Sequence, residues 1–490
     1  MKTFKRLLCL ALCVLLTGCS ANPAASPVAQ LPSAPAGPDA PLGDAGLSQE
    51  TIVPLYLPSH DGQNLLAFYE TMLLPRDQHP AQIVLQALMA HPSNSRVRPL
   101  AGDVTLSLYG ANPVEISGGV CTVNLSANAL ALSMQELFTA ALAISSTLCE
   151  LDGIDYVNLL IAGTPVAMDV GGNLPLGLLT STTTQELPVL WEQMIARRTP
   201  VGELPAHTPL TATAALYFPL ADGTGVAAEP RRIAFSGQHP QQQVTALLTA
   251  LSAGADTLTV AADMPDLNSL LLFLPEITEL DSGGRRVTLH FTANVKERIA
   301  ASCDPSCMFA AITLTLTSFV PSVQQVCILV GDGALTSLYS PTLGSQLFPG
   351  ALMNRQHFAH ALMELTTVYI PQGHQLTART LSMPYRSASS PRAVLLTLDA
   401  LPEGLTDADI LGLAIKDDTL LVNFSTRYAD VLRQSPQQQR LAAYAMVNTL
   451  CERLGTRRVR FYFGSETVET LGSNLAWDGE FLCNPALITH

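Results

Sequence analysis

The sequence has few charged residues, few aromatic residues and no long apolar run beyond its N-terminus. Charged residues make up 13% and aromatic residues 6% of the 490 positions, whereas 48% are hydrophobic. This composition excludes general disorder and indicates well-buried cores. Because no later stretch reaches about 18 uninterrupted apolar residues, we expect no transmembrane helix.

Basic residues are also scarce. The chain has 26 Lys and Arg against 40 Asp and Glu, which gives a formal net charge of −14. A chain this acidic, without a basic cluster, is not expected to bind nucleic acid. It should also not adhere electrostatically to anionic lipid.

Catalytic and metal-binding signatures are missing as well. The sequence contains no G-x-S-x-G, G-x-x-x-x-G-K-[ST], H-E-x-x-H or G-x-G-x-x-G motif. His357 and His360 lie three apart in an Ala/Leu-rich stretch, but no third ligand is near in sequence, which favours a structural or surface role. Beyond the N-terminal apolar segment, Cys303 and Cys307 form the only close cysteine pair, and zinc needs four ligands, or three plus water. We therefore predict neither a metal nor a cofactor, and interpret this pair as a local disulfide or two free thiols.

Seven cysteines remain after the first twenty residues, an odd number that does not form a disulfide framework. They are Cys121, Cys149, Cys303, Cys307, Cys327, Cys451 and Cys483. Cys149 and Cys451 occupy matched positions in two repeated segments. We predict that both are unpaired thiols.

The N-terminus has the three-part layout of a secretory signal. Lys2, Lys5 and Arg6 precede an apolar run at 7–16, which is shorter than the roughly 20 residues that a spanning helix needs. The run ends in Leu16-Thr17-Gly18-Cys19, which resembles a bacterial lipobox. This resemblance implies a lipid attached to Cys19 and cleavage just before it. The alternative is an ordinary signal peptide in which Cys19 is incidental.

The segment after Cys19 is rich in Ala, Pro, Gly and Ser up to about Glu50. It has too few large apolar side chains to offset its chain entropy, and its prolines favour an extended spacer. We interpret 1–19 as signal peptide and lipobox, and 20–50 as a linker. The expected location is the outer face of the bacterial cytoplasmic membrane.

One unit recurs three times in the remaining sequence. Each copy opens on an aromatic residue and a proline, continues into a Gly turn and a second extended run, and so predicts a β-hairpin. A helix starting near a proline follows, at 80–89, 240–251 and 391–401. The recurring motif residues are Tyr56, Pro58, Asp61 and Gly62, then Tyr217, Pro219, Asp222 and Gly223, then Tyr369, Pro371 and Gly373.

A second hairpin, a second helix and a final strand complete each unit. The outgoing hairpin strand alternates, with Cys121, Val123 and Leu125 on one face, which predicts a half-buried strand. The fold prediction is α+β, with three tandem β-β-α-β-β-α-β domains at 51–185, 210–350 and 364–490. We expect two helices to cover one face of a sheet in each domain. A short helix is expected within 188–209, packed between units.

The apolar residues of the strands, the glycines of the turns and the apolar stripes of the helices recur in all three copies. No polar side chain able to act as a base, nucleophile or metal ligand is seen to recur in them. Asp61 and Asp222 are better explained as turn residues than as a catalytic pair, since Asp-Gly favours hairpin turns. Tyr56, Tyr217 and Tyr369 are expected to serve packing. The sequence therefore predicts a protein without enzymatic activity.

The repeated residues resemble the GerMN domain of bacterial sporulation and spore-germination lipoproteins. The similarity is best at 216–233, which includes Glu229-Pro230-Arg231-Arg232, and at 419–463. In the first unit Phe68-Tyr69-Glu70 replaces the expected Glu and Arg, and the third unit lacks the acidic turn residue. Proteins of this family typically carry two such domains, whereas three units occur here. The family's domains are considered similar to ring-building modules of secretion and sporulation channels.

This resemblance implies assembly rather than catalysis. The favoured hypothesis is an anchored scaffolding lipoprotein of the envelope, active in sporulation or germination. Its partners would be the membrane, through the lipid, and envelope or spore-complex proteins or further copies of the chain. The intermembrane space of a forming spore is included in the expected location. The alternative is a ligand-binding lipoprotein for cell-wall fragments or a small solute, which needs a deep pocket with converging polar groups.

Overall fold

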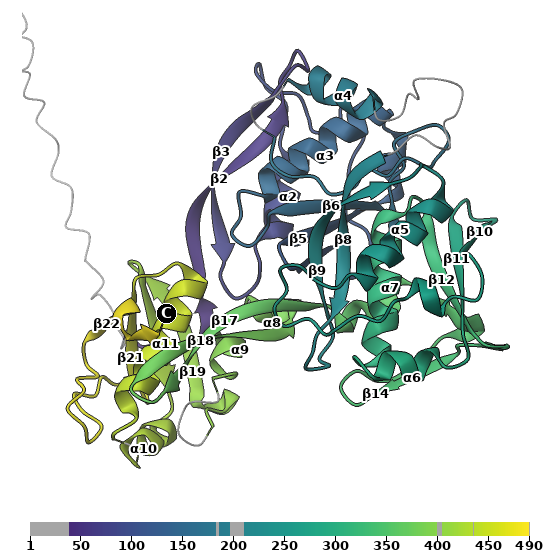
Figure 1. Ribbon diagram of the computed structural model, residues 1–490. Helices are drawn as coiled ribbons and strands as arrows, with labels where there is room; N and C mark the ends of the chain where they lie inside the picture. The colour runs from purple at the N-terminus through teal and green to yellow at the C-terminus, as the bar shows by residue number, and fades with distance from the viewer. Residues whose placement is uncertain (1–38, 183–185, 197–209, 399–403, 435, 490) are drawn as a thin grey trace, which may run out of the picture. The chain divides into compact units, whose positions relative to one another are not determined.

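The computed structural model describes residues 39–182, 186–196, 210–398, 404–434 and 436–489. From Ala40 onward these residues belong to one compact unit. The predicted signal peptide, the lipobox with Cys19 and the linker up to residue 38 lie outside the described residues. Figure 1 shows the helices and strands of the compact unit.

The protein is α+β, as predicted, with several small sheets. We call 48–182 the first module, 210–362 the second and 363–489 the third. Each module contains one principal sheet, with strand orders β4-β5-β6-β7, β10-β11-β12-β13 and β19-β20-β21-β22. In every one the first pair is antiparallel, the middle pair parallel and the last pair antiparallel. The strands are β4 Val114–Ser117, β5 Val120–Leu125, β6 Tyr156–Ile161, β7 Thr164–Pro165, β10 Glu276–Glu279, β11 Arg285–Phe291, β12 Val323–Val330, β13 Gly333–Ala334, β19 Ile410–Lys416, β20 Thr419–Phe424, β21 Arg458–Phe463 and β22 Glu480–Leu482.

Each module opens with an antiparallel hairpin that is separate from the principal sheet. The first hairpin pairs β2 (Ser48–Pro58) with β3 (Leu65–Pro75), and the second pairs β8 (Leu210–Pro219) with β9 (Val226–Phe235). The third pairs β17 (Met363–Gln372) with β18 (Gln375–Pro384). Short strands complete the set: β14 Ser337–Ser340, β15 Gly344–Leu347, β16 Leu352–Met353 and β23 Ile488–Thr489.

The helices correct one expectation about packing. The second helix of each module contacts both the hairpin and the principal sheet: α3 (Met134–Leu148), α7 (Pro305–Phe319) and α11 (Gln439–Leu454). The first helices, α2 (Ala81–Ala90) and α5 (Pro240–Ser252), contact mainly the hairpin and the second helix, and α5 also contacts β10. The first helix therefore covers mainly the separate hairpin, which has an apolar face of its own, and not the principal sheet as expected. In the third module the proline-led helix is short, since α9 spans only Pro391–Leu395.

The predicted apolar face of the outgoing strands is confirmed, but only β11 is half-buried, because Thr122 of β5 and Leu421 and Asn423 of β20 are buried on the opposite face. Cys121, Val123 and Leu125 of β5 are all fully buried, as are the matching residues of β11 and β20. The matching residues are Val287, Leu289, Phe291, Leu420, Val422 and Phe424. The period of two places these side chains on one face of each sheet, within the apolar cores.

The first and second modules share one apolar core, and the third module has its own. One continuous apolar cluster runs through the first and second modules, from Val53 to Leu362. A separate cluster fills the third module and includes Trp477 and Phe461. Because two modules bury one common core, we expect them to unfold together and the third to unfold on its own.

The C-terminal part of the predicted linker is structured. β1 (Gly43–Gly46) pairs in parallel with β19 of the third module before the chain enters the first module at β2. A Cβ added to Gly46 would lie 2.6 Å from Cβ of Ala414, so the backbones approach too closely for a larger residue. Leu47, only 2% exposed, then enters the core of the third module. Composition alone concealed this strand, since glycine-rich backbone pairs without apolar side chains.

The helix expected within 188–209 is present as α4 (Leu187–Ala196). Its Trp191 ring lies 5.7 Å from the ring of Phe138 in α3, so the helix packs on the first module. The remaining helices are α6 (Val295–Ala300), α8 (Tyr385–Ala388) and α10 (Thr426–Gln434). Among the residues described, no helix has the length and apolar character needed to cross a membrane.

Candidate functional site

The predicted turn residues occupy hairpin turns. Gly62, Gly223 and Gly373 all have positive φ, which favours glycine. Asp61 Oδ1 accepts a hydrogen bond from the amide of Gln63 at 3.0 Å, and Asp222 Oδ1 accepts one from the amide of Thr224 at 3.0 Å. These contacts are those of aspartate-stabilised turns, and they account for both carboxylates without catalysis.

The recurrent tyrosines mark a contact that is present three times. The backbone N–H of Tyr56 donates to the Thr147 hydroxyl at 2.9 Å. Tyr217 and Tyr369 make the same bond to Thr315 and Thr449, each at 3.0 Å. Each bond ties the opening hairpin to the second helix of its module and satisfies an N–H that would otherwise be buried without a partner. We call this contact the hairpin clasp.

Acidic side chains extend the clasp in two modules. The Tyr56 hydroxyl donates to Glu150 at 2.9 Å, and the Tyr369 hydroxyl donates to Glu452. Burial, together with Glu150, raises the pKa of Tyr56 to about 12, and burial with Glu452 raises the pKa of Tyr369 to about 12. Neither tyrosine can act as a base near neutral pH, so the packing role predicted for them is supported.

The second module replaces this acid with Ser318 and recruits an arginine. Arg355 donates to Ser318 Oγ at 2.7 Å, to the Tyr217 hydroxyl at 3.1 Å and to Glu115 of the first module at 2.8 Å. The side chains of Arg355 and Glu115 are 12% and 8% exposed. Removing one partner of a buried ion pair leaves the other charge buried and uncompensated. This pair therefore stabilises the contact between the first and second modules.

A turn of the first module contacts both other modules. Ser117 Oγ donates to the carbonyl of Met363 at 2.5 Å and accepts from the amide of Ala228 at 3.0 Å. The amide of Gly118 donates to Glu364 Oε2 at 3.1 Å. Burial raises the pKa of Glu364 to about 7. The turn between β4 and β5 is therefore the junction at which the three modules meet.

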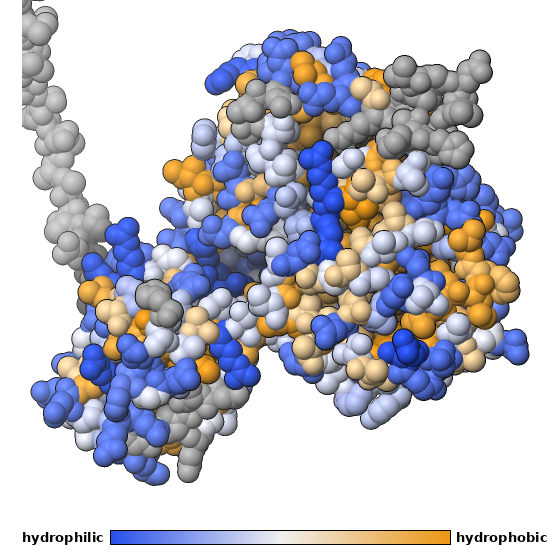
Figure 2. All heavy atoms as spheres, viewed as in Figure 1, coloured by the Kyte–Doolittle hydropathy of each residue, from blue (hydrophilic) through white to orange (hydrophobic). Residues whose placement is uncertain are grey.

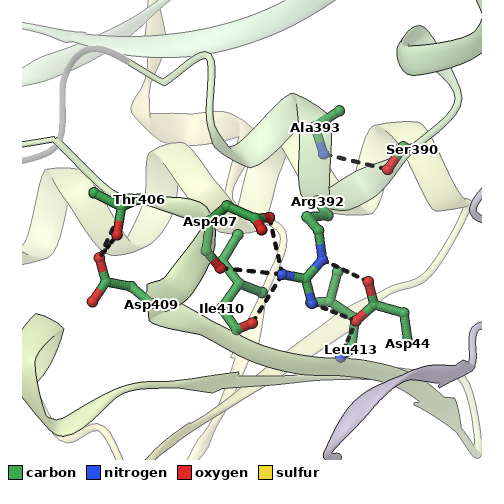
Figure 3. Close-up of polar contacts among 9 residues, drawn as sticks. All are labelled: Asp44, Ser390, Arg392, Ala393, Thr406, Asp407, Asp409, Ile410 and Leu413. Atoms are coloured by element: carbon green, nitrogen blue, oxygen red, sulfur yellow. Dashed lines mark hydrogen bonds and ion pairs between the residues drawn. The ribbon is translucent and has the colours of Figure 1, made fainter.

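The N-terminal strand is held by an arginine fork on the third module (Figure 3). Arg392 donates to the two oxygens of Asp44 at 2.6 and 2.8 Å, and to the carbonyl of Ile410 at 2.9 Å. Asp44 Oδ1 also accepts from the amide of Leu413 at 3.0 Å. Hydrogen bonding from Asp44 is the main cause that raises the pKa of Arg392. We call β1, Asp44 and Arg392 the strand clamp.

The strand clamp shows what the outer edge of a principal sheet can accept. In the third module β1 occupies the edge of β19. In the first module β17 and α8 contact the corresponding strand β4. In the second module, no strand of the described residues pairs with the outer edge of β10. Leu272, Phe273 and Leu274, just before β10, are 47%, 65% and 73% exposed. Figure 2 shows apolar surface over the region where Figure 1 places β10 and β11.

A cleft of about 670 Å³ lies between the first and second modules. Residues of the first module's principal sheet line one side, and residues of β12 and the segment 354–359 line the other. The paired Glu115 and Arg355 belong to its lining. Its volume lies within the range of small-molecule sites.

Comparison with known proteins identifies two of the modules. The family model described as Germane, sporulation and spore germination, matches residues 54–167 and 215–336. The first and second modules therefore match the Germane family, and the matched residues make up just under half of the chain. The resemblance to GerMN proteins inferred from the repeated residues is therefore confirmed. The match covers the opening of the first module despite its departures, and no residue of the third module is matched.

Solved structures of similar proteins share a low sequence identity with the chain. The tandem GerMN domains of the sporulation protein GerM from Bacillus subtilis are 21% identical, covering 58% of this chain and 92% of that one, with a TM-score of 0.21. The first GerMN domain of the same protein is 24% identical, covering 27% and 97%, with a TM-score of 0.21. A lipoprotein from Clostridium perfringens is 22% identical, covering 28% and 88%, with a TM-score of 0.18. None of the curated proteins compared with the chain matches it.

His357, Cys303 and Cys307 have surroundings that explain them without a ligand. Asn354 and His357 cap one another across the short helix at 355–361, through bonds of 3.1 and 3.2 Å. The seven cysteines of the described region, including Cys149, Cys451, Cys303 and Cys307, are free thiols. Burial raises the pKa of Cys303 and of Cys307 to about 12, which keeps both protonated and unreactive. No cluster of three or more potential metal ligands occurs in the part of the chain that the structure describes.

Sequence reasoning missed the polar residues of the hairpin clasp. A threonine hydroxyl does recur in all three modules, contrary to the expectation that no such polar group does. The signal was present, because Thr-Leu-Cys-Glu occurs at both 147–150 and 449–452. The strand clamp left no local signal, since 348 residues separate Asp44 from Arg392.

Proposed function

We propose that this protein is a lipid-anchored, non-enzymatic assembly component of the cell envelope that acts in sporulation or spore germination. The match to the Germane family supports a role in sporulation or spore germination. The hairpin turns, the clasp and the arginine contacts support the absence of catalysis, because they assign the recurrent polar groups to the fold. Descent of the three modules from one repeated unit is part of the proposal, and their matching sheet order supports it.

The observation that carries the proposal is the strand clamp. At β19 an extended strand adds to the outer edge of a principal sheet and is fixed by one arginine. The equivalent edge of β10 carries no strand of the described residues, and an apolar segment lies beside it. Strand addition to an open edge is an established way for sheets to recruit a partner.

The partner that this edge fits is an envelope protein supplying an extended strand with apolar and basic side chains. Apolar side chains would cover Leu272, Phe273 and Leu274. Basic side chains would complement the exposed Glu276 and Glu279 of β10, of which Glu279 already pairs with Arg285, and the net charge of −14. Pairing of β10 with β10 of a second copy would instead place these acids opposite one another.

Anchoring at Cys19 completes the proposal. Lipid on Cys19 would hold the chain on the outer face of the cytoplasmic membrane, including the membrane that faces the intermembrane space of a forming spore. Because β1 attaches to the third module, the tether would reach that module first. Confinement to a plane raises the effective concentration of the β10 edge, so weak contacts can build an assembly.

Site-specific photo-cross-linking in the native cells tests the assembly role. A photoreactive residue at Phe273 should capture one defined envelope protein, whereas the same residue at Tyr339 should not. Tyr339 is a suitable control because it is 72% exposed on a different hairpin. The double substitution Phe273→Asp and Leu274→Asp should abolish assembly of the envelope complex in sporulating or germinating cells. The double substitution Tyr339→Asp and Leu347→Asp should preserve it. Identical behaviour of the two pairs would refute the use of the β10 edge, and capture of this chain alone would replace the partner with a second copy.

A further inference from the structure

The cleft between the first and second modules has a distinctive lining. Six carboxamide side chains contribute to it: Asn112, Asn124, Gln324, Gln325, Asn354 and Gln356. Thr122 and Thr164 add hydroxyl groups. Glu115 and Arg355 are its charged members, and they neutralise one another at 2.6 Å. The cleft therefore offers many neutral polar groups and no free charge for an ionic ligand.

The carboxamides are oriented by the fold through their oxygens. Asn124 Oδ1 accepts the amide of Gly163 at 2.9 Å, and Asn354 Oδ1 accepts the amide of His357 at 3.2 Å. Arg286 donates to Gln325 Oε1 at 3.4 Å, and Arg386 donates to Asn112 Oδ1. The side-chain nitrogens of these four residues have no hydrogen-bond partner within the described residues. Each carboxamide thus keeps two N–H donors for a ligand.

An aromatic ring stands at the same cleft. Tyr109 belongs to the lining and is 44% exposed. Its neighbours Gly110 and Ala111 are small and also line the cleft, so they leave access to the ring. An exposed ring beside polar donors provides a flat apolar face and a polar edge together.

We propose that this cleft binds a neutral oligosaccharide. Sugar hydroxyls and acetamido carbonyls accept the free carboxamide donors, and the C–H face of a sugar ring packs on Tyr109. The one cation among the lining residues, Arg355, is paired with Glu115, so the lining favours a neutral ligand, although Arg286 and Arg386 adjoin it through Gln325 and Asn112. A peptide would need apolar pockets for its side chains, whereas Leu160 is the one large aliphatic residue among the lining residues. The inference is independent of the β10 edge, since no residue from 272 to 279 lines the cleft.

Isothermal titration of the full chain with tri-N-acetylchitotriose tests the inference, with trialanine as the peptide comparison. The trisaccharide should bind and trialanine should not. Tyr109→Ala should weaken trisaccharide binding about tenfold, and Gln325→Leu about fivefold. Tyr339→Ala and Gln375→Leu are matched controls outside the cleft and should leave binding unchanged. Circular dichroism checks folding, and Gln356→Ala, at an exposed position, replaces Gln325→Leu if that variant unfolds.

Three results would overturn the inference. The first is the absence of trisaccharide binding at millimolar concentration. The second is equal binding by the cleft variants and the controls. The third is binding of trialanine that Tyr109→Ala abolishes, which would make the cleft a peptide site. Each of these results leaves the cross-linking at Phe273 unaffected, so the two proposals fail separately.

Discussion

Replacing Glu229 with glutamine should destabilise the joint body of the first and second modules by about 3 kcal/mol at neutral pH. The Glu229 side chain is 2% exposed and pairs with Arg231. Its Oε2 accepts the amides of Thr257 at 2.8 Å and Asp256 at 3.1 Å. Glutamine keeps the shape of the side chain but removes the charge that these donors stabilise.

The magnitude is set by the pKa of Glu229. Burial alone would raise this pKa, but the bonds from Thr257, Asp256 and Arg231 outweigh burial and lower it from 4.5 to about 2. A carboxyl whose pKa is lower in the folded state stabilises that state fully above its unfolded pKa. The contribution is lost as the pH falls from about 4.5 to about 2. At pH 3 the difference between parent and variant should therefore shrink to about 1.4 kcal/mol.

Scanning calorimetry provides the assay. The separate cores predict two transitions, of which the larger belongs to the first two modules. At pH 7, Glu229→Gln should lower the midpoint of the larger transition by about 5 °C and leave the smaller one in place. Glu279→Gln is the control, because Glu279 also pairs with an arginine but is 68% exposed. An effect of Glu229→Gln that is the same at pH 7 and pH 3 would refute the electrostatic reasoning.

Three further predictions concern the anchor, the clasp and the clamp. Cys19→Ser should move the protein from the membrane pellet to the soluble fraction, or leave it uncleaved, and unchanged detergent partitioning would exclude Cys19 as the anchor. Thr147→Val should cost about 1–3 kcal/mol in urea unfolding because the Tyr56 amide loses its acceptor, whereas Thr245→Val, whose hydroxyl bonds only its own helix, should be nearly neutral. Asp44→Asn should speed hydrogen exchange at 43–46, and exchange as slow as in the parent would show that Arg392 does not hold β1.

The sequence by itself determined the local elements and the family. Alternation at Cys121, Val123 and Leu125 was enough to place a strand and its buried face, because a period of two is a property of the backbone. The turns at Gly62, Gly223 and Gly373 could also be predicted, because a positive φ favours glycine. Repetition of these patterns carried the resemblance that the Germane match at 54–167 and 215–336 confirms.

Only the tertiary structure decided which parts come together. Each hairpin is separate from its principal sheet because it packs against the second helix. The local periodicity of the sequence does not show this packing. The Arg355–Glu115 pair joins residues 240 positions apart, and the Asp44–Arg392 fork joins residues 348 apart. The sequence around a carboxylate or a guanidinium does not reveal its partner, because the geometry that pairs them exists only once both modules have folded. The carboxamide cleft arises in the same way, from side chains that two modules place on facing surfaces.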